Sequence, residues 1–388
     1  MTNAIPIKFA GAEDQLHDTA AAEVGFNDFG DPYYLTGLRV LLNSIDNDLK
    51  LDEVHRERVF GMVLGALTGR LYSQKGWREN PECLKTEIHR PLIITGVVRT
   101  GTTPLQKVLA VDPQFQGLEY WIAPNPMVRP PRKTWVRHPL YQRAVAGLDA
   151  LHQVNPTMDL IHEMVAEEPD ECLNMMVQDF VSNMFPSCLV IPSYDKWWMQ
   201  QDETPSYYRY LNNLKLIGFR EQNKRWLLKN PGHILGIEPL LKIFPDACIV
   251  QTHRDPVKTI PSVCDLIMMV RKFNVGSAAH PEDEGPREVV LWSIAAKRAM
   301  KAREQHPERF YDVHLRDFHA DPIGVIQGIY RHYGLTLEPA VEENMKVWLK
   351  KHEESREGAH QYAPEQFGIT EQDIRREFKE YIDYYYPS

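Results

Sequence analysis

One stretch of the chain, residues 91–113, constrains the fold more than any other. It opens with PLIITG at 91–96, a continuous apolar run of the kind that forms a buried strand. A loop bounded by Gly96 and Gly101 follows, and leucine and valine then recur at helical spacing over residues 102–109. Strand, glycine-rich loop and helix in this order form the phosphate-binding unit of an α/β sheet.

The helix after this loop has predictable boundaries. Thr102 or Thr103 can cap its first turn, and Pro104 suits that turn because no backbone donor is needed there. Asp112 and Pro113 are expected to end it. The buried face is predicted to carry Leu105, Val108 and Leu109.

A second series of strands and helices follows further along the chain. Apolar runs predict strands at 225–230 (RWLLKN), 247–253 (ACIVQTH) and 310–315 (FYDVHL). Amphipathic helices are expected over 232–244 and 254–273, the second starting with Asp255 as cap and Pro256 as first residue. The alternation of strands and helices predicts a three-layer α/β fold, with a central parallel sheet flanked by helices on both faces.

Ligands of such sheets bind at the carboxyl ends of the strands. Three polar segments follow predicted strands directly: Gly96–Thr103, Lys229–His233 and His253–Ser262. We therefore expect these segments to converge at one edge of the sheet and to form the functional site.

The first 90 residues differ from the rest of the chain. Residues 1–30 are polar and are expected to be irregular, whereas 32–88 carry apolar residues at helical spacing. We therefore predict a helical extension at 1–88, packed on an α/β domain at 89–388.

Composition narrows the class of protein. The chain of 388 residues has a net charge of −9, which argues against non-specific nucleic-acid binding. Its five cysteines are scattered and form no C-x-x-C pair, so reduced thiols are expected rather than disulfides or a zinc site. We read no signal peptide and no apolar run long enough to span a membrane, and expect a cytoplasmic protein.

The loop lacks the lysine of a nucleotide-binding P-loop. Gly96 and Gly101 give the G-x-x-x-x-G spacing, but Thr102 and Thr103 stand where Lys and Ser or Thr would follow. The cation of the loop is Arg99, and the backbone N–H groups of 99–103 can still bind an anion. Such a loop suits a ligand with fewer charges at its reacting end than a triphosphate, for which magnesium is dispensable.

These residues resemble the sulfotransferases that use 3′-phosphoadenosine 5′-phosphosulfate (PAPS). GVVRTGTTPL is similar to their P-[KR]-S-G-T-T loop, and HRDPVKTIPS carries Arg254 and Ser262 at the eight-residue spacing of the family's second motif. Further segments resemble the large, mainly bacterial branch: EEPDEC (167–172), LLKNPGH (227–233), 317–335 and 358–368. The resemblance spans residues 91–370 and implies a P-loop-like fold and PAPS as co-substrate, without a metal.

The resemblance also implies site residues. The 5′-phosphosulfate is expected at Arg99, Thr100, Gly101, Thr102 and Thr103. Arg254 and Ser262 are expected to bind the 3′-phosphate, with Arg356 and Gly358 in a lid over it. Three residues depart from the family pattern: Val98 replaces a proline, Thr100 a serine, and Gln361 a residue that is often basic.

Sulfuryl transfer to an alcohol needs a group that accepts the hydroxyl proton. Glu119 follows a strand-like run and is our predicted base, with His233 and His253 as alternatives. Lys229 is expected to stabilise the leaving phosphate. The acidic run 167–171 is either a solvated helix start or a part of the acceptor side.

Aromatic and methionine residues are frequent between the two motifs. Most are expected in the core, and some are expected to line a pocket for an apolar, hydroxylated acceptor such as a lipid, isoprenoid quinone, sterol or phenol. A lipid acceptor would imply transient membrane contact without an anchor. The alternative functions are a P-loop nucleotide or nucleoside kinase and a nucleotide-binding regulator without catalysis.

Overall fold

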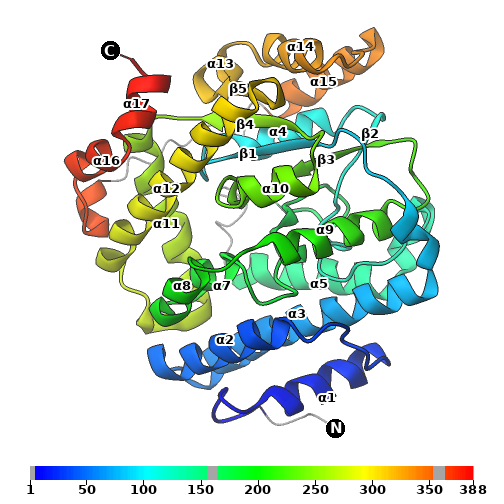
Figure 1. The fold of residues 1–388 in the computed structure, drawn as a ribbon, viewed down its shortest axis with the longest axis vertical. Helices are drawn as coiled ribbons and strands as arrows, with labels where there is room; N and C mark the ends of the chain where they lie inside the picture. The colour runs from blue at the N-terminus through cyan, green and yellow to red at the C-terminus, as the bar shows by residue number, and fades with distance from the viewer. Residues whose placement is uncertain (1–4, 155–163, 353–362, 388) are drawn as a thin grey trace.

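The computed structural model describes residues 5–154, 164–352 and 363–387. Its centre is a five-stranded sheet in the order β2-β3-β1-β4-β5, in which every pairing is parallel (Figure 1). The strands are β1 Leu92–Gly96, β2 Phe115–Gln116, β3 Arg225–Lys229, β4 Cys248–His253 and β5 Phe310–His314. The predicted α/β class and its four main strands are confirmed.

Alternate residues of the strands pack on opposite faces of the sheet, as the period of two requires. Leu92 and Ile94 of β1 belong to a cluster with helices α4, α14 and α15, whereas Ile93 belongs to a cluster with α9 and α10. The bounds of these helices are α4 Thr102–Leu109, α9 Thr204–Ile217, α10 Ile237–Ile243, α14 Pro322–Tyr333 and α15 Pro339–Lys351. Both faces are therefore covered by helices, which makes the three layers of the predicted fold.

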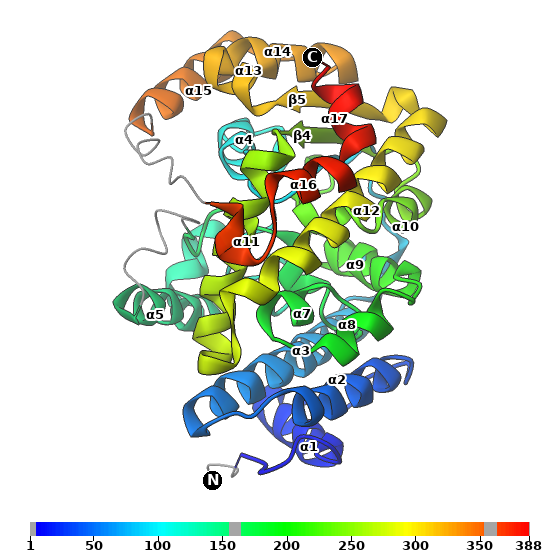
Figure 2. The same cartoon turned by 90° about the vertical axis from the view of Figure 1, so that its left-hand side faces the viewer.

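The remaining helices surround these layers. They are α1 Glu13–Val24, α2 Tyr34–Asp48, α3 Glu53–Glu79, α5 Pro139–Val154, α7 Met184–Cys188, α8 Pro192–Trp198, α11 Pro256–Val275, α12 Glu284–Gln305, α13 Leu315–Ala320, α16 Glu371–Glu377 and α17 Lys379–Tyr385. In both views, α1–α3 lie at one end of the molecule and α13–α15 at the other (Figures 1 and 2).

The register of β1 aligns the ends of the three central strands. Ile94 lies opposite Lys229 of β3 and Val250 of β4, and Gly96 lies opposite Thr252. Gly96 has a φ of 148°, and a Cβ atom there would lie 2.6 Å from the carbonyl oxygen of Thr252. Only glycine lets the chain leave β1 so close to β4, and this brings the following loop toward the end of β4.

The prediction that residues 1–30 are irregular is wrong, because α1 occupies Glu13–Val24. Its buried residues Leu16, Ala20 and Val24 recur every four positions, and this short apolar stripe is hidden among polar residues. One apolar cluster joins α1–α3 to α7, α11, α12 and α16. A buried ion pair, Arg70 to Asp179 at 2.5 Å, also links α3 to the later chain. The domain boundary after residue 88 stays a prediction.

Two predicted helix starts also need correction. The cap of α4 is Gly101, in the left-handed conformation at φ 92°, and neither Thr102 nor Thr103 makes a side-chain capping bond. The helix expected over 232–244 is divided into a 3₁₀ turn, Pro231–Ile234, and α10. Pro239 explains the break, because its ring would clash with the carbonyl of Leu235 in a continuous helix.

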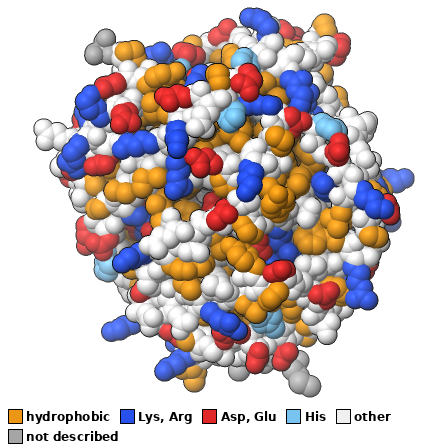
Figure 3. All heavy atoms as spheres, in the orientation of Figure 1, with side chains coloured by type: hydrophobic (Ala, Val, Ile, Leu, Met, Phe, Trp, Pro, Cys, Tyr) orange, Lys and Arg blue, Asp and Glu red, His pale blue; other side chains and the backbone are white. Residues whose placement is uncertain are grey.

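The charges on the surface, the state of the cysteines and the character of the helices can be compared with the expectations from composition. Basic and acidic side chains are interspersed over the face seen in Figure 3, so the net charge of −9 is not gathered there. All five cysteines are free thiols. Within the described ranges, no helix has the length and apolar character that crossing a bilayer requires.

Candidate active site

The loop between β1 and α4 has an unusual backbone. Arg99 adopts φ 70°, which is uncommon for a residue other than glycine, and Gly101 adopts φ 92°. Such strained conformations concentrate at functional sites. The loop leads directly into α4, and the first N–H groups of a helix have no partner within it, which makes its N-terminus a site for anions.

Thr100 anchors the loop to the sheet. Its hydroxyl is buried, donates to the carbonyl of Val97 at 2.6 Å and lies 2.5 Å from the hydroxyl of Thr252 in β4. The side chain therefore faces the sheet, and Thr100 can contact an anion through its backbone N–H group alone.

The three residues predicted to bind the two phosphate groups lie together. Arg99 Nε donates to Ser262 Oγ at 3.2 Å, and Arg254 Nη1 donates to the carbonyl of Arg99 at 3.2 Å. Ser262 lies in α11, and the start of that helix is fixed as predicted, because the Asp255 side chain accepts from the N–H of Val257. The structure thus joins the first loop to the segment after β4.

Lys229, the last residue of β3, is completely buried. Its Nζ lies 2.8 Å from Glu171 Oε1, 3.9 Å from Asp170 Oδ1 and 3.4 Å from Thr103 Oγ1. A buried ammonium group needs such counter-charges, because the loss of hydration is costly otherwise. This contact brings part of the acidic run to the start of α4, which sequence reasoning left open.

The acidic run is fixed by main-chain contacts with residues 118–120. Asp170 N donates to the carbonyl of Leu118 at 2.9 Å, and Tyr120 N donates to the carbonyl of Glu168 at 3.1 Å. Lys107 of α4 forms an ion pair with Glu168 at 2.9 Å. The run is therefore held in a non-helical conformation beside α4 and is not a solvated helix start.

Glu119 lies in the same segment, but its carboxylate is directed elsewhere. Glu119 Oε2 accepts from Arg129 Nε at 3.1 Å, and Arg129 also donates to Gln116 and Glu221. Burial raises the pKa of Glu119, while Arg129 opposes that rise. Glu119 is thus held beside Arg129, whereas Lys229 is held beside Glu171.

The two histidines proposed as alternative bases are both fully buried. His233 Nδ1 lies 2.9 Å from the hydroxyl of Tyr207, its Nε2 has no partner among the described residues, and burial lowers its pKa to about 3. His253 is bound on both ring nitrogens, to the Tyr381 hydroxyl at 2.7 Å and to Asp312 Oδ1 at 3.1 Å. Burial lowers the pKa of His253 too, although Asp312 opposes that effect. Both rings are therefore held within the core.

An aromatic cluster adjoins the acidic run. The Trp121 ring lies 5.5 Å from Trp135, 5.1 Å from His138 and 5.8 Å from Tyr141, between ring centroids. The hydroxyl of Tyr141 donates to Glu167 Oε2 at 2.8 Å, which connects this cluster to the site. Most aromatic residues between the motifs belong to the core, as predicted. Trp121, Trp135, Trp198 and Tyr207 are buried, whereas Tyr208 is exposed.

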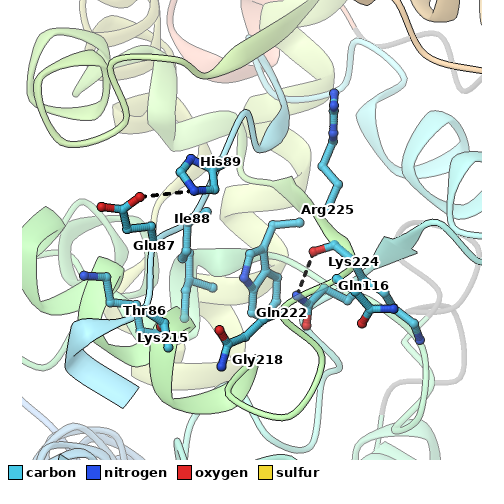
Figure 4. A pocket seen from close by; sticks show the side chains of 13 residues that line it. Thr86, Glu87, Ile88, His89, Gln116, Lys215, Gly218, Gln222, Lys224 and Arg225 are labelled. Atoms are coloured by element: carbon cyan, nitrogen blue, oxygen red, sulfur yellow. Dashed lines mark hydrogen bonds and ion pairs between the residues drawn. The ribbon is translucent and has the colours of Figure 1, made fainter. Parts of the chain in front are cut away.

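A cavity of about 190 Å³ lies elsewhere (Figure 4). Glu87 and His89 stand at one side of it and Gln116 and Lys224 at the other. Arg225, the first residue of β3, also lines this cavity, and Lys229 is at the opposite end of the same strand. The cavity is therefore separate from the site described above.

Two predicted residues, Arg356 and Gly358, lie outside the described residues, as does Gln361. Among the described residues, no group of three or more His, Cys, Asp or Glu side chains is placed to hold a metal ion.

The comparisons with known proteins all identify the same family. A model described as "Sulfotransferase family" matches residues 91–339. Over 295 residues, the chain is 26% identical to the omega-hydroxy-beta-dihydromenaquinone-9 sulfotransferase Stf3 of Mycobacterium tuberculosis, covering 73% of this chain and 72% of Stf3. The solved structure of sulfotransferase STF1 from Mycobacterium tuberculosis H37Rv is 36% identical with a TM-score of 0.86, over 96% of this chain and 100% of STF1. STF9 from Mycobacterium avium is 26% identical with a TM-score of 0.87, over 100% of this chain and 98% of STF9.

Proposed function

The chain belongs to the sulfotransferase family, and on that premise we propose that it transfers the sulfuryl group of PAPS to a hydroxyl group of an apolar small molecule or lipid. One observation carries the proposal: at the carboxyl edge of the sheet, Arg99 contacts both Arg254 and Ser262, which come from a segment far away in the sequence. Two guanidinium groups beside a hydroxyl and two helix N-termini suit a ligand with two separate anionic groups.

Each of the two anionic groups of the donor is assigned to its own set of residues. Arg99 and the first turn of α4 receive the 5′-phosphosulfate, where the helix dipole adds to the attraction. Arg254 and Ser262 receive the 3′-phosphate, the group that distinguishes PAPS from ATP. We retain Arg356 and Gly358 as predicted contacts of that phosphate.

When bound, PAPS supplies a sulfuryl group on a phosphate that can leave as adenosine 3′,5′-bisphosphate. Lys229 and Arg99 offset the charge that develops on the bridging oxygen as its bond to sulfur breaks. The acceptor oxygen forms the new bond to sulfur, and a carboxylate takes its proton. The products are a sulfate ester and the bisphosphate.

We propose Glu171 as that carboxylate. Its Oε1 lies 2.8 Å from Lys229 Nζ, so proton acceptor and charge stabiliser adjoin each other. The Glu171 side chain is 24% exposed and the Glu119 side chain 11%, and a general base must be reached by the acceptor hydroxyl. Glu119, the base predicted from the sequence, is the competing candidate, and the variants Glu171→Gln and Glu119→Gln separate the two.

The acceptor is proposed to be apolar. The aromatic cluster around Trp121 joins the acidic run through Tyr141 and Glu167. Trp121 and Trp135 are buried, so the half-buried His138 and Tyr141 are the members that we propose to meet an apolar acceptor. Stf3, a relative, is named for a hydroxylated menaquinone. We therefore place hydroxylated isoprenoid lipids first among the acceptors, ahead of sterols and phenols.

Incubation of the protein with ³⁵S-labelled PAPS and a lipid extract tests this function. We expect label in an apolar sulfate ester, identified by mass spectrometry, without added metal and in the presence of EDTA. The variant Arg254→Ala is the control, since it keeps Lys229 and Glu171 but should lose the donor. Label confined to polysaccharide would contradict the acceptor class, and magnesium-dependent turnover of ATP would contradict the donor.

A further inference from the structure

The residue next to Arg254 is held more firmly than packing alone requires. His253 ends β4, and its backbone pairs with His314 of β5, so Arg254 leaves the sheet directly after it. Asp255 then caps α11, which fixes the other side of Arg254. Arg254 is therefore the single residue between a strand end and a helix cap, and its direction depends on how these two neighbours are fixed.

The His253 ring is fixed on three sides. Nδ1 lies 2.7 Å from the hydroxyl of Tyr381, and Nε2 lies 3.1 Å from Asp312 Oδ1. The ring of Tyr385 stacks on the imidazole with centroids 3.9 Å apart and planes at 27°. An imidazole whose two nitrogens are bound and whose face is covered has one orientation.

These partners come from the last helix and from a neighbouring strand. Tyr381 and Tyr385 lie in α17, which sits beside α12 in both views (Figures 1 and 2). Asp312 lies in β5 and forms an ion pair with Arg303 of α12. We call Tyr381, Tyr385 and Asp312, the three residues that hold His253, the C-terminal clamp.

An apolar residue could fill the space of His253 without needing partners. A buried imidazole with two hydrogen bonds has a fixed orientation, because each hydrogen bond is directional and is lost when the ring rotates. The group whose geometry depends on it is Arg254, which reaches the carbonyl of Arg99 at 3.2 Å.

We propose that the C-terminal clamp determines selectivity for the 3′-phosphate by holding His253 and, through it, the direction of Arg254. His253 is a positioning residue in this proposal and has no part in the chemical step. The inference rests on the proposed function, since it assumes that Arg254 meets the 3′-phosphate.

The variant Tyr381→Phe tests the clamp, because it removes one hydroxyl and keeps the buried ring. Adenosine 3′,5′-bisphosphate and AMP differ only in the 3′-phosphate, so calorimetric titration with both isolates the contribution of that group. We expect the affinity for the bisphosphate to fall roughly 3- to 10-fold and the affinity for AMP to stay the same. Asp312→Asn, which alters the other bond to His253, should act in the same direction.

A matched control is Tyr333→Phe. Its hydroxyl donates to the carbonyl of Ile249 at 2.6 Å, so it removes a buried tyrosine bond to β4 at a distance from Arg254. The ratio of the two affinities should not change in this control. If Tyr381→Phe weakens both nucleotides equally, or leaves both affinities unchanged, the inference about the clamp is wrong. The proposed function still stands in that case, provided that the wild-type protein prefers the bisphosphate to AMP. A wild-type protein that binds AMP and the bisphosphate equally would overturn both.

Discussion

The last residue of β3 and the residue after β4 are both cations, but their partners differ. Lys229, at the end of β3, contacts the carboxylates of Glu171 and Asp170. Arg254, just after β4, contacts a backbone carbonyl, and Arg99 beside it contacts the hydroxyl of Ser262. A cation among carboxylates suits proton transfer next to a developing charge. Two guanidinium groups that lie together near the start of a helix suit the binding of an anion, because each can donate charge-assisted hydrogen bonds to a phosphate oxygen.

Among the variants that test the difference between these two cations, Glu171→Gln has the largest expected effect. The change keeps the shape of the side chain and removes its basicity, so we expect kcat to fall roughly 10²- to 10⁴-fold. The affinity for adenosine 3′,5′-bisphosphate should change little, because Glu171 is assigned to the acceptor side. Steady-state kinetics with the acceptor found in the extract, together with calorimetry, measure both.

Glu119→Gln supplies the contrast to that variant. Its carboxylate is bound by Arg129, and we expect more than about a tenth of the activity to remain. If Glu119→Gln is inactive and Glu171→Gln is active, then Glu119 is the base and the prediction from the sequence stands.

The second test is at the end of β4. Arg254→Ala should weaken binding of adenosine 3′,5′-bisphosphate by about 2–5 kcal/mol, since a buried phosphate loses its charged partner. Binding of AMP should be nearly unchanged. Calorimetric titration in EDTA measures both, and a comparable loss for the two nucleotides would remove Arg254 from the 3′-phosphate.

A third test compares His233, which follows β3, with His253, the last residue of β4. Burial lowers the pKa of His233 to about 3, from 6.5 in an unfolded chain. The unfolded state therefore binds a proton below pH 6.5 that the folded state does not, and this lowers the free energy of unfolding as the pH falls. Between pH 7.5 and 5 the loss is about 2 kcal/mol.

His233→Asn should abolish that part of the acid sensitivity. Denaturant unfolding at several pH values from 5 to 7.5 measures it. The same experiment on His253→Asn should show a smaller change, since Asp312 counteracts the lowering of the pKa there. Equal acid sensitivity in wild type and His233→Asn would contradict the assignment.

The smallest expected effect is that of Thr103→Val. Its hydroxyl lies 3.4 Å from Lys229 Nζ, a long contact, and valine keeps the branched shape at the start of α4. We expect kcat to fall about 2- to 10-fold, with nucleotide affinity unchanged. A 100-fold loss would mean that Thr103, and not Glu171, is the main partner of the reacting group.

Much of this architecture could be predicted because continuous apolar runs identify buried strands. Strands β1, β3, β4 and β5 begin and end within one or two residues of the predicted runs. The cap of α11 by Asp255 was also predictable, because Asp is a favoured N-cap residue and Pro is favoured at the first position of a helix. The break before α10 could have been inferred from Pro239.

The arrangement around Lys229 could not be predicted in the same way. Glu171 lies 58 positions before Lys229 in the sequence, in a segment without regular periodicity. The position of that segment depends on main-chain bonds to residues 118–120, for which no side-chain pattern exists. The ion pair of Glu119 with Arg129 could not be predicted either, because both residues lie in a segment without regular periodicity.

The central place of β1 in the sheet has a consequence for the synthesis of the protein. Its two neighbours, β3 and β4, begin about 130 and 150 residues after β1 ends. At about 5–20 residues per second, the ribosome releases the second of them roughly 8–30 s after β1 has emerged. Until β3 emerges, the apolar strand β1 has two unpaired edges, a condition that favours aggregation of a nascent chain. The loop after β1, which Thr100 anchors to Thr252 of β4, can therefore take its final position only after most of the polypeptide has left the ribosome.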